Sequence, residues 1–408
     1  MNVRINPRRL SGPVTPPPSK SLAHRLVIAA ALAAGTSTLR NVERSQDIEA
    51  TLRCVEKFGC TWEEPEPGTL RIHGIWTRER EPEPLPFFDC GESGSTLRFL
   101  IPIALALTGG GRFTGHGRLM ERPQEPYFQV FDKLGIVHRL EDGVLTVEGQ
   151  LRPGEYRLPG NVSSQFFTGL LFALPLLESP SAVISTTELE SAAYVTMTMG
   201  VLDQAFVPVK FSREKNAFLV SHALYQCFDA AVEADWSQAA FWYAAAALGN
   251  NLKLKGLNPY SAQGDAVITR YYRKLTQPGD VTINLANCPD LLPPMAVMAC
   301  LRRGTTRFIG GARLRLKESD RLSTVHQMLK AIGGASAEET AGLTVYGVSH
   351  LPGGTVDGAN DHRIVMAAAV AATRCEGSVL IRDAGAVKKS YPGFWREYER
   401  LGGDVRVL

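Results

Sequence analysis

Cysteine is scarce and unpatterned in this sequence of 408 residues. The seven cysteines form no C-x-x-C pair and no cluster with histidine; they are Cys54, Cys60, Cys90, Cys227, Cys288, Cys300 and Cys375. An odd number of dispersed thiols argues against a disulfide framework and against a structural zinc site. The pattern is typical of a reducing compartment, and we expect the protein to be cytoplasmic.

Long apolar runs and a strong net charge are also missing. No apolar stretch reaches the roughly 18 residues that a membrane-spanning helix needs, so we expect no membrane association. The 44 Lys+Arg and 41 Asp+Glu leave a net charge of +3, which is too small to indicate a nucleic-acid partner. The absence of a G-x-x-x-x-G-K-[ST] loop, and of a G-x-G-x-x-G turn between a strand and a helix, argues against a nucleotide-dependent phosphotransferase or an RNA-end-processing enzyme.

A recurring unit is the most informative feature of the sequence. Its signature is a short apolar helix rich in Ala and Leu, followed by a turn and a β-rich stretch. Six copies begin at residues 25, 98, 166, 239, 294 and 363, at intervals of 73, 68, 73, 55 and 69 residues. This period predicts a repeated supersecondary unit. The alternative is six unrelated buried helices in some other α/β fold.

A second, amphipathic helix follows in each copy, and hairpin-like stretches such as 137–149 complete the unit. The helix that is apolar on all sides should be buried, and the amphipathic one should be half-exposed. We therefore predict an α/β (α+β) fold of six βαβαββ units, three in each of two lobes. Residues 14–230 are expected to form one lobe, and residues 1–13 with 231–408 the other.

Cations gather where these helices begin. The apolar helices of one lobe should run parallel, so their N-termini should meet at one end and attract anions. Ser, Thr, Asp and Asn at these places could simply cap the helices. Capping does not require the cations that accompany them, and for each cation alone a surface ion pair is the alternative; they are Lys20, Arg98, Arg122, Arg321, Arg363 and Lys389. Asp290 and Glu318, within this cluster, are candidates for general acid and base work.

Nine short motifs, in this order, resemble one known family. They are PPSKSLAHR (17–25), GESGSTLR (91–98), ERP (121–123), VSSQF (162–166), QGD (263–265), PD (289–290), KESDR (317–321), NDHR (360–363) and VKKSYP (387–392). Together they are similar to the EPSP synthases, the 3-phosphoshikimate 1-carboxyvinyltransferases. The resemblance implies a two-lobed inside-out α/β prism with the active site in the cleft between the lobes, and the 14–230 lobe as the one that binds shikimate 3-phosphate.

The resemblance also implies two sets of binding residues. Phosphoenolpyruvate would be held by Lys20, Gly94, Arg122, Gln165, Arg321, Arg363 and Lys389. Shikimate 3-phosphate would be held by Lys20, Ser21, Arg25, Ser163, Ser164, Gln165, Ser191, Tyr194, Asp290 and Lys317.

The implied reaction is enolpyruvyl transfer by addition and elimination, in the shikimate pathway of aromatic amino-acid biosynthesis. Asp290 would take the proton from the 5-hydroxyl, while Glu318 and Lys20 would protonate the methylene carbon and assist loss of phosphate. We expect no metal and no cofactor, only small anionic substrates, and a monomer.

Four positions depart from the family pattern: Pro18, Glu92, Phe99 and Arg313. They bear on affinity and inhibitor response rather than on the reaction. A sister enzyme that transfers enolpyruvyl to UDP-N-acetylglucosamine is the nearest rival, but no cysteine stands shortly before Arg122-Pro123. An anion-binding protein without catalysis is the other rival, and only loss of Asp290, Glu318 or Lys20 would favour it.

Overall fold

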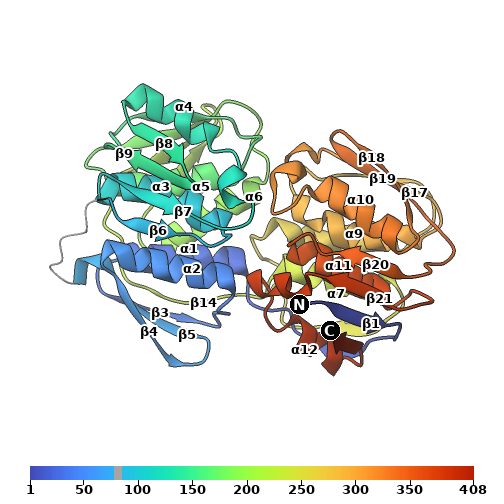
Figure 1. Cartoon of the computed structure of the whole chain (residues 1–408). Helices are drawn as coiled ribbons and strands as arrows, with labels where there is room; N and C mark the ends of the chain where they lie inside the picture. Colours follow the sequence, from blue (N-terminus) through green and yellow to red (C-terminus); the bar gives the residue numbers. More distant parts are fainter. Residues whose placement is uncertain (78–84) are drawn as a thin grey trace. The chain divides into compact units, whose positions relative to one another are not determined.

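The structure, a computed structural model, describes residues 1–77 and 85–408. The chain folds into two compact units (Figure 1). Residues 18–233 form the first unit, and residues 1–17 with 234–408 form the second. Each unit has its own hydrophobic core, as a separate domain requires.

Three apolar helices form the centre of the first unit: α1 (Lys20–Leu32), α3 (Gly94–Leu107) and α5 (Ser164–Ala173). Each begins at a serine, because the side-chain oxygens of Ser19, Ser93 and Ser163 accept hydrogen bonds from main-chain amides of the first turn. Most of their residues are fully buried, as the all-round apolar pattern predicts. The serine caps therefore set where these helices begin.

Three four-stranded sheets pack in the first unit with these helices. Their strand orders are β14 (Asp229–Ala231), β3 (Thr36–Arg40), β5 (Thr69–His73), β4 (Thr61–Glu66); β6 (Phe87–Asp89), β7 (Gly110–Thr114), β9 (Val144–Glu148), β8 (Val137–Glu141); and β10 (Glu155–Leu158), β11 (Ser181–Ser185), β13 (Ala217–Val220), β12 (Val209–Ser212). The first two strands of each sheet are parallel, and the last two form an antiparallel hairpin. The helices between strand and hairpin are α2 (Gln46–Val55), α4 (Glu125–Leu134) and α6 (Ala192–Gln204).

The second unit repeats this plan. Its apolar helices are α7 (Trp236–Ala247), α9 (Leu292–Cys300) and α11 (His362–Ala372), and its second helices are α8 (Ile268–Leu275), α10 (Arg321–Ala331) and α12 (Phe394–Arg400). One sheet has the order β16 (Val281–Asn284), β17 (Thr305–Ile309), β19 (Gly342–Tyr346), β18 (Ala335–Glu339). The other has the order β20 (Gly354–Asp357), β21 (Val379–Arg382), β1 (Val3–Asn6), β22 (Asp404–Val407), so the N-terminal strand lies inside the last sheet.

The fourth copy of the repeat is shorter than predicted. Its only strands among the described residues are β15 (Asn251–Leu254) and β2 (Ser11–Val14), which pair in parallel. Because α8 ends at Leu275 and β16 already begins at Val281, no room is left for a hairpin. The expectation of six complete βαβαββ units is therefore wrong for this copy, while the α/β architecture of two three-copy units is confirmed.

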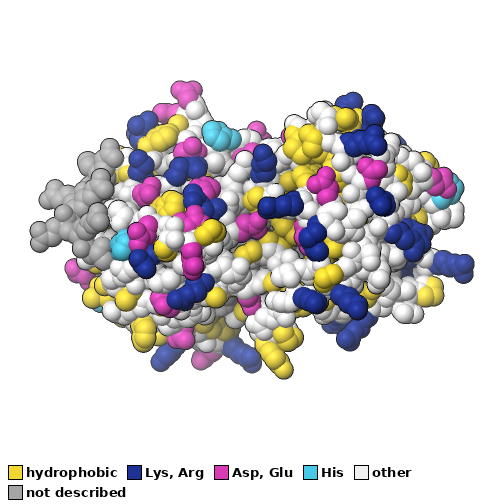
Figure 2. All heavy atoms as spheres, turned by 90° about the horizontal axis from the view of Figure 1, so that it is seen from below, with side chains coloured by type: hydrophobic (Ala, Val, Ile, Leu, Met, Phe, Trp, Pro, Cys, Tyr) yellow, Lys and Arg dark blue, Asp and Glu magenta, His cyan; other side chains and the backbone are white. Residues whose placement is uncertain are grey.

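The two units differ in charge. The first has 20 Lys+Arg and 26 Asp+Glu in its sequence, and the second has 24 Lys+Arg and 15 Asp+Glu. On the face drawn in Figure 2, Lys and Arg crowd over the second unit, and Asp and Glu are more numerous over the first. Cations in the net-negative first unit must therefore be concentrated locally if that unit is to bind an anion. Within residues 1–77 and 85–408, no helix has both the length and the apolar character to span a bilayer.

Candidate active site

In the first unit, side chains at the starts of α3 and α5 are joined by one buried arginine. The Arg98 guanidinium donates to Gln165 Oε1 (2.9 Å) and to the carbonyl of Pro123 (2.9 Å), and it lies over the Phe166 ring. The amide nitrogen of Gln165 donates in turn to Ser95 Oγ (3.0 Å). These bonds hold the two helix N-termini together, where the helix dipoles favour an anion.

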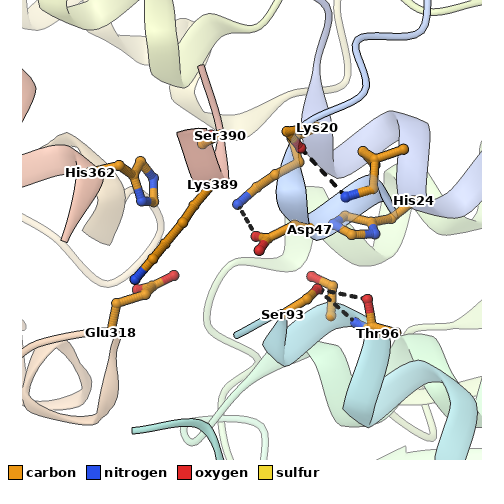
Figure 3. Close-up of polar contacts among 12 residues, drawn as sticks. Lys20, His24, Asp47, Ser93, Thr96, Glu318, His362, Lys389 and Ser390 are labelled. Carbon is orange, nitrogen blue, oxygen red and sulfur yellow. Dashed lines mark hydrogen bonds and ion pairs between the residues drawn. The ribbon is translucent and has the colours of Figure 1, made fainter. Parts of the chain in front are cut away.

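Lys20, at the start of α1, reaches a carboxylate that the sequence did not reveal. Its Nζ lies 2.6 Å from Asp47 Oδ2 on α2. A dashed line marks this contact in Figure 3. Only 17% of the Lys20 side chain and 9% of the Asp47 side chain is exposed. The pair fixes the direction of the ammonium group, which a lysine alone would not do.

Gly94 makes room for Arg122. A Cβ atom at position 94 would lie 2.8 Å from Cζ and 2.9 Å from Nη2 of Arg122, and still closer to Nη1. Side-chain carbons do not approach other heavy atoms so closely. The guanidinium therefore lies directly against the glycine at the N-terminus of α3, where its charge adds to the helix dipole.

Arg25 is almost completely buried in the first unit. Its Nε donates to Thr198 Oγ1 (2.9 Å), Nη1 to the carbonyl of Ser21 (2.6 Å) and Nη2 to the carbonyl of Tyr194 (3.2 Å). Burial lowers the pKa of Arg25 to about 10, so it remains charged at neutral pH. Phe99, one of the departures from the family pattern, lies against this guanidinium at 5.2 Å from its ring centroid.

Three serines lie at the starts of α5 and α6. Ser163 caps α5, Ser164 is its first residue, and Ser191 precedes α6. Ser191 has a left-handed backbone (φ 55°), which is strained for a residue with a side chain. Strain of this kind concentrates at ligand sites.

In the second unit, Asp290 lies among three cations. Its Oδ1 is 2.7 Å from Arg321 Nη1 and 3.5 Å from Lys317 Nζ, and its Oδ2 is 3.3 Å from Arg363 Nη2. Burial alone would raise the pKa of Asp290, but Arg363, Lys317 and Arg321 together hold it well below its usual range. Asp290 is therefore ionised at neutral pH.

Arg321 is surrounded by carboxylates. Besides Asp290, it donates to Glu318 Oε2 (2.6 Å) and through Nε to Asp361 Oδ2 (2.8 Å), and its side chain is only 1% exposed. Asp361 also accepts from Ser319 Oγ (2.9 Å) and caps α11. Arg321 therefore orients both acids, Asp290 and Glu318, relative to each other.

Lys317 and Lys389 complete the cationic side of this unit. Burial, partly opposed by Asp290, lowers the pKa of Lys317 to about 8, so its proton is held less tightly than that of an exposed lysine. Lys389 Nζ donates to the carbonyl of Asn360 (2.6 Å), and in Figure 3 its side chain points toward Glu318. Arg313 is buried nearby and donates to the carbonyl of Ala286.

The structure thus divides the predicted residues into two sets. The first-unit set is Lys20, Ser21, Arg25, Gly94, Arg122, Ser163, Ser164, Gln165, Ser191 and Tyr194. The second-unit set is Asp290, Lys317, Glu318, Arg321, Arg363 and Lys389. Each set gathers at helix N-termini of its own unit. No group of three His, Cys, Asp or Glu side chains that could hold a metal ion occurs in the described part of the chain.

Three acidic residues of the site were missed as functional positions. Asp47 and Asp361 stand where an acid is an ordinary helix-terminus residue, so only their ion pairs distinguish them. Asp265, from the QGD motif, is buried and accepts from Ser237 Oγ. Burial and the nearby charge of Asp290 raise the pKa of Asp265 to about 6. The QGD motif could have pointed to Asp265, although the residue types in this motif do not by themselves indicate what the carboxylate does.

Solved structures share this fold. EPSP synthase from Acinetobacter baumannii matches with a TM-score of 0.80 at 23% identity, covering 100% of both chains. The enolpyruvyl transferase NikO from Streptomyces tendae matches with a TM-score of 0.78 at 17% identity, covering 99% of this chain and 98% of that one. The fold is that of the enolpyruvyl transferases.

Sequence comparison identifies the family of the chain within this class of proteins. The family model EPSP synthase (3-phosphoshikimate 1-carboxyvinyltransferase) matches residues 5–398. The 3-phosphoshikimate 1-carboxyvinyltransferases of Clostridium acetobutylicum and Clostridium kluyveri are 41% and 40% identical, each covering 99% of this chain and 98% of its own. The chain belongs to the EPSP synthase family, and it is a transferase of aromatic amino-acid biosynthesis.

Proposed function

We propose that this chain transfers the enolpyruvyl group of phosphoenolpyruvate to the 5-hydroxyl of shikimate 3-phosphate, giving 5-enolpyruvylshikimate 3-phosphate and phosphate. The observation that carries the proposal is the Asp290 carboxylate, which lies within 3.5 Å of Lys317, Arg321 and Arg363 and shares Arg321 with Glu318. One oriented base, one oriented acid and a set of cations are what an addition of an alcohol to an enol phosphate needs.

The first unit supplies most of the proposed contacts to shikimate 3-phosphate. Ser163, Ser164 and Ser191 would donate to its phosphate, since they lie at the starts of α5 and α6. The other proposed contacts are Lys20, Ser21, Arg25, Gln165, Tyr194, Asp290 and Lys317. The burial of Arg25 and the strained backbone of Ser191 support a preformed anion site.

Both units supply the proposed contacts to phosphoenolpyruvate: Lys20, Gly94, Arg122, Gln165, Arg321, Arg363 and Lys389. Arg122 lies against Gly94, so a guanidinium and a helix N-terminus present donors together. Arg321 already binds three carboxylates, so its proposed part is to offset the negative charge of Asp290 and Glu318 beside the anionic ligand. We propose that the two half-sites act on the same pair of substrates.

The proposed reaction has two steps. In the addition, the 5-hydroxyl oxygen bonds to C2 of phosphoenolpyruvate as its proton passes to Asp290, and C3 takes a proton from Glu318 or Lys20, which gives a tetrahedral intermediate. In the elimination, C3 returns a proton to Glu318 or Lys20 as the C2–O bond to phosphate breaks, and the leaving phosphate takes up the proton that Asp290 received. Atoms and charge balance without any oxidant or metal.

The low pKa of Asp290 would make it a weak base in the ligand-free protein. Phosphate and carboxylate groups of the substrates would neutralise part of the charge of Arg363, Lys317 and Arg321, which hold that pKa down. Binding of the substrates should therefore raise the proton affinity of Asp290 at the moment the hydroxyl must lose its proton. This supports a base that is activated by its own substrates.

Asp290→Asn tests the proposal in an assay of phosphate release from phosphoenolpyruvate with shikimate 3-phosphate. The amide keeps the size of the side chain but cannot take the proton, so we expect kcat to fall by roughly 100-fold or more with KM values little changed. Asp404→Asn, which alters an acid paired with Asn6 and Arg406 in the same unit, is the matched control and should retain wild-type turnover. A fully active Asp290→Asn enzyme would move the base elsewhere, with Glu318 the next residue to test.

The cellular setting is part of the proposal. We propose that the enzyme works in the cytoplasm as a monomer, since each unit of the chain has its own core and both half-sites come from one chain. Sedimentation of the active enzyme at assay concentration checks the monomer.

A further inference from the structure

A chain of buried hydrogen bonds runs behind the first-unit half-site and joins its helices α1, α2 and α3. His24 Nδ1 lies 2.7 Å from Thr51 Oγ1, which lies 2.7 Å from Thr96 Oγ1. Thr96 Oγ1 in turn donates to Ser93 Oγ at 2.7 Å. All four side chains are at most 1% exposed, and Figure 3 shows His24, Ser93 and Thr96 beside the Lys20–Asp47 pair.

The direction of the hydrogens in this chain follows from its Ser93 end. Ser93 Oγ accepts from the Thr96 hydroxyl and also from the Thr96 main-chain amide (3.1 Å), as the cap of α3. Thr96 has then given up its hydrogen, so Thr51 must donate to Thr96 and accept from His24 Nδ1–H. Burial, and then the charges of Lys20 and Arg25, lower the pKa of His24 well below its usual value, so the ring is neutral. Donation to Thr51 then places its one hydrogen on Nδ1. A 3.3 Å contact to the Asp47 carbonyl is the longer alternative for the Thr51 hydrogen.

The residues of this hydrogen-bonded chain are close in sequence to residues of the proposed site. His24 is one helical turn after Lys20 and directly before Arg25, and Thr51 is one turn after Asp47. Ser93 directly precedes Gly94, on which Arg122 lies. The ring nitrogen His24 Nε2 is buried with no hydrogen-bond partner among the described residues, so the ring is held from the Thr51 side alone.

We propose that His24 and Thr51 are positioning residues, which set the Lys20–Asp47 pair and the Gly94 end of α3 at the spacing that phosphoenolpyruvate requires. The inference rests on the proposed function for the identity of the ligand. Neither residue touches the substrates; the hydroxyl of Thr51 is the only link among these bonds between α2 and both neighbouring helices.

Thr51→Val, which replaces the hydroxyl by a methyl group of similar shape, breaks the chain at its middle. We expect the KM for phosphoenolpyruvate to rise about five- to tenfold, the loss of one or two buried hydrogen bonds, and to rise more than the KM for shikimate 3-phosphate, which shares only Lys20 of the displaced groups with phosphoenolpyruvate. Thr51→Ser keeps the hydroxyl and should restore the KM. Tyr225→Phe is the matched control, because it removes a buried 2.7 Å bond to the Phe172 carbonyl in the same unit, away from the site.

Hydrogen exchange of the ligand-free protein separates this inference from the proposed function. Thr51→Val should speed exchange of main-chain amides in the first turn of α3, residues 94–98, while Tyr225→Phe and Thr51→Ser should not. A wild-type enzyme that releases no phosphate would overturn the proposed function, and the exchange result would still decide whether the chain positions α3. An unchanged KM for phosphoenolpyruvate in an active Thr51→Val enzyme, an equal rise in both KM values, or wild-type exchange at residues 94–98 overturns the inference.

Discussion

The contact between Gly94 and Arg122 gives a sharp test of the proposed phosphoenolpyruvate site. In Gly94→Ala, the new methyl group would lie 2.8 Å from Arg122 Cζ and 2.9 Å from Nη2, so the guanidinium must move. A hydrogen bond to a charged group is worth about 1.5 to 3 kcal/mol, and loss of one such bond corresponds to roughly a 10- to 150-fold weaker affinity. We therefore expect the KM for phosphoenolpyruvate to rise at least tenfold, with the KM for shikimate 3-phosphate within twofold.

The control for this experiment is another helical glycine of the same unit. A Cβ atom at Gly200, inside α6, meets nothing within 4 Å. Gly200→Ala should leave both KM values unchanged and raise the stability slightly, since alanine is the better helix former. The two variants add the same methyl group and differ only in what it touches.

The effect must also run through Arg122. If it does, adding Gly94→Ala to Arg122→Ala should weaken the binding of phosphoenolpyruvate little further, because the guanidinium that the methyl group displaces is already gone. The KM for phosphoenolpyruvate is measured from initial rates at saturating shikimate 3-phosphate, for the wild type, Gly94→Ala, Arg122→Ala and the double variant. Additive losses in the double variant, or an unchanged KM in Gly94→Ala, would refute the reasoning.

Two further predictions follow from the serines and from Asp265. Ser163→Ala with Ser164→Ala removes donors to the phosphate of shikimate 3-phosphate, so its KM should rise at least tenfold while that of phosphoenolpyruvate holds; equal changes in both would contradict the assignment. Burial and the charge of Asp290 raise the pKa of Asp265 from 3.8 to about 6, so the folded state binds a proton more tightly than the unfolded state. The free energy of unfolding of the protein should therefore fall as the pH rises from about 4 to 6, by up to roughly 3 kcal/mol. Asp265→Asn, which can still accept from Ser237, should remove that slope in urea melts at pH 4, 5 and 7, and parallel profiles for the two proteins would disprove it.

Much of the fold could be predicted because the pattern of hydrophobic residues is the same in each copy of the repeat. The apolar helices, their serine caps and the cations at their N-termini are all local features of the sequence. The missing hairpin of the fourth copy was visible in principle, since the interval of 55 residues is shorter than the others by about the length of a hairpin. The period is counted from the starts of the apolar helices alone, so it does not reveal that the fourth copy lacks the two strands of its hairpin.

The site was harder to predict, because ion pairs join residues far apart in sequence. Asp361 is the N-cap of α11, a common place for an aspartate, but the same carboxylate also binds Arg321 from 40 residues away. Asp47 likewise lies 27 residues from Lys20. Residue types at helix ends indicate that anions bind there; they do not indicate which cations already have a carboxylate partner within the protein.

The position of β1 inside the last sheet bears on how the protein is made. Asn6 of β1 bonds to Asp404 of β22, 398 residues further along, so β1 leaves the ribosome before the first unit and its neighbour β22 leaves after it. The first unit, in contrast, is continuous from residue 18 to 233, and β14 completes its sheet at the end of that stretch. Synthesis at about 5 to 20 residues per second therefore lets the first unit fold well before the second can, while β1 remains an unpaired strand whose exposed edge must be kept from other chains.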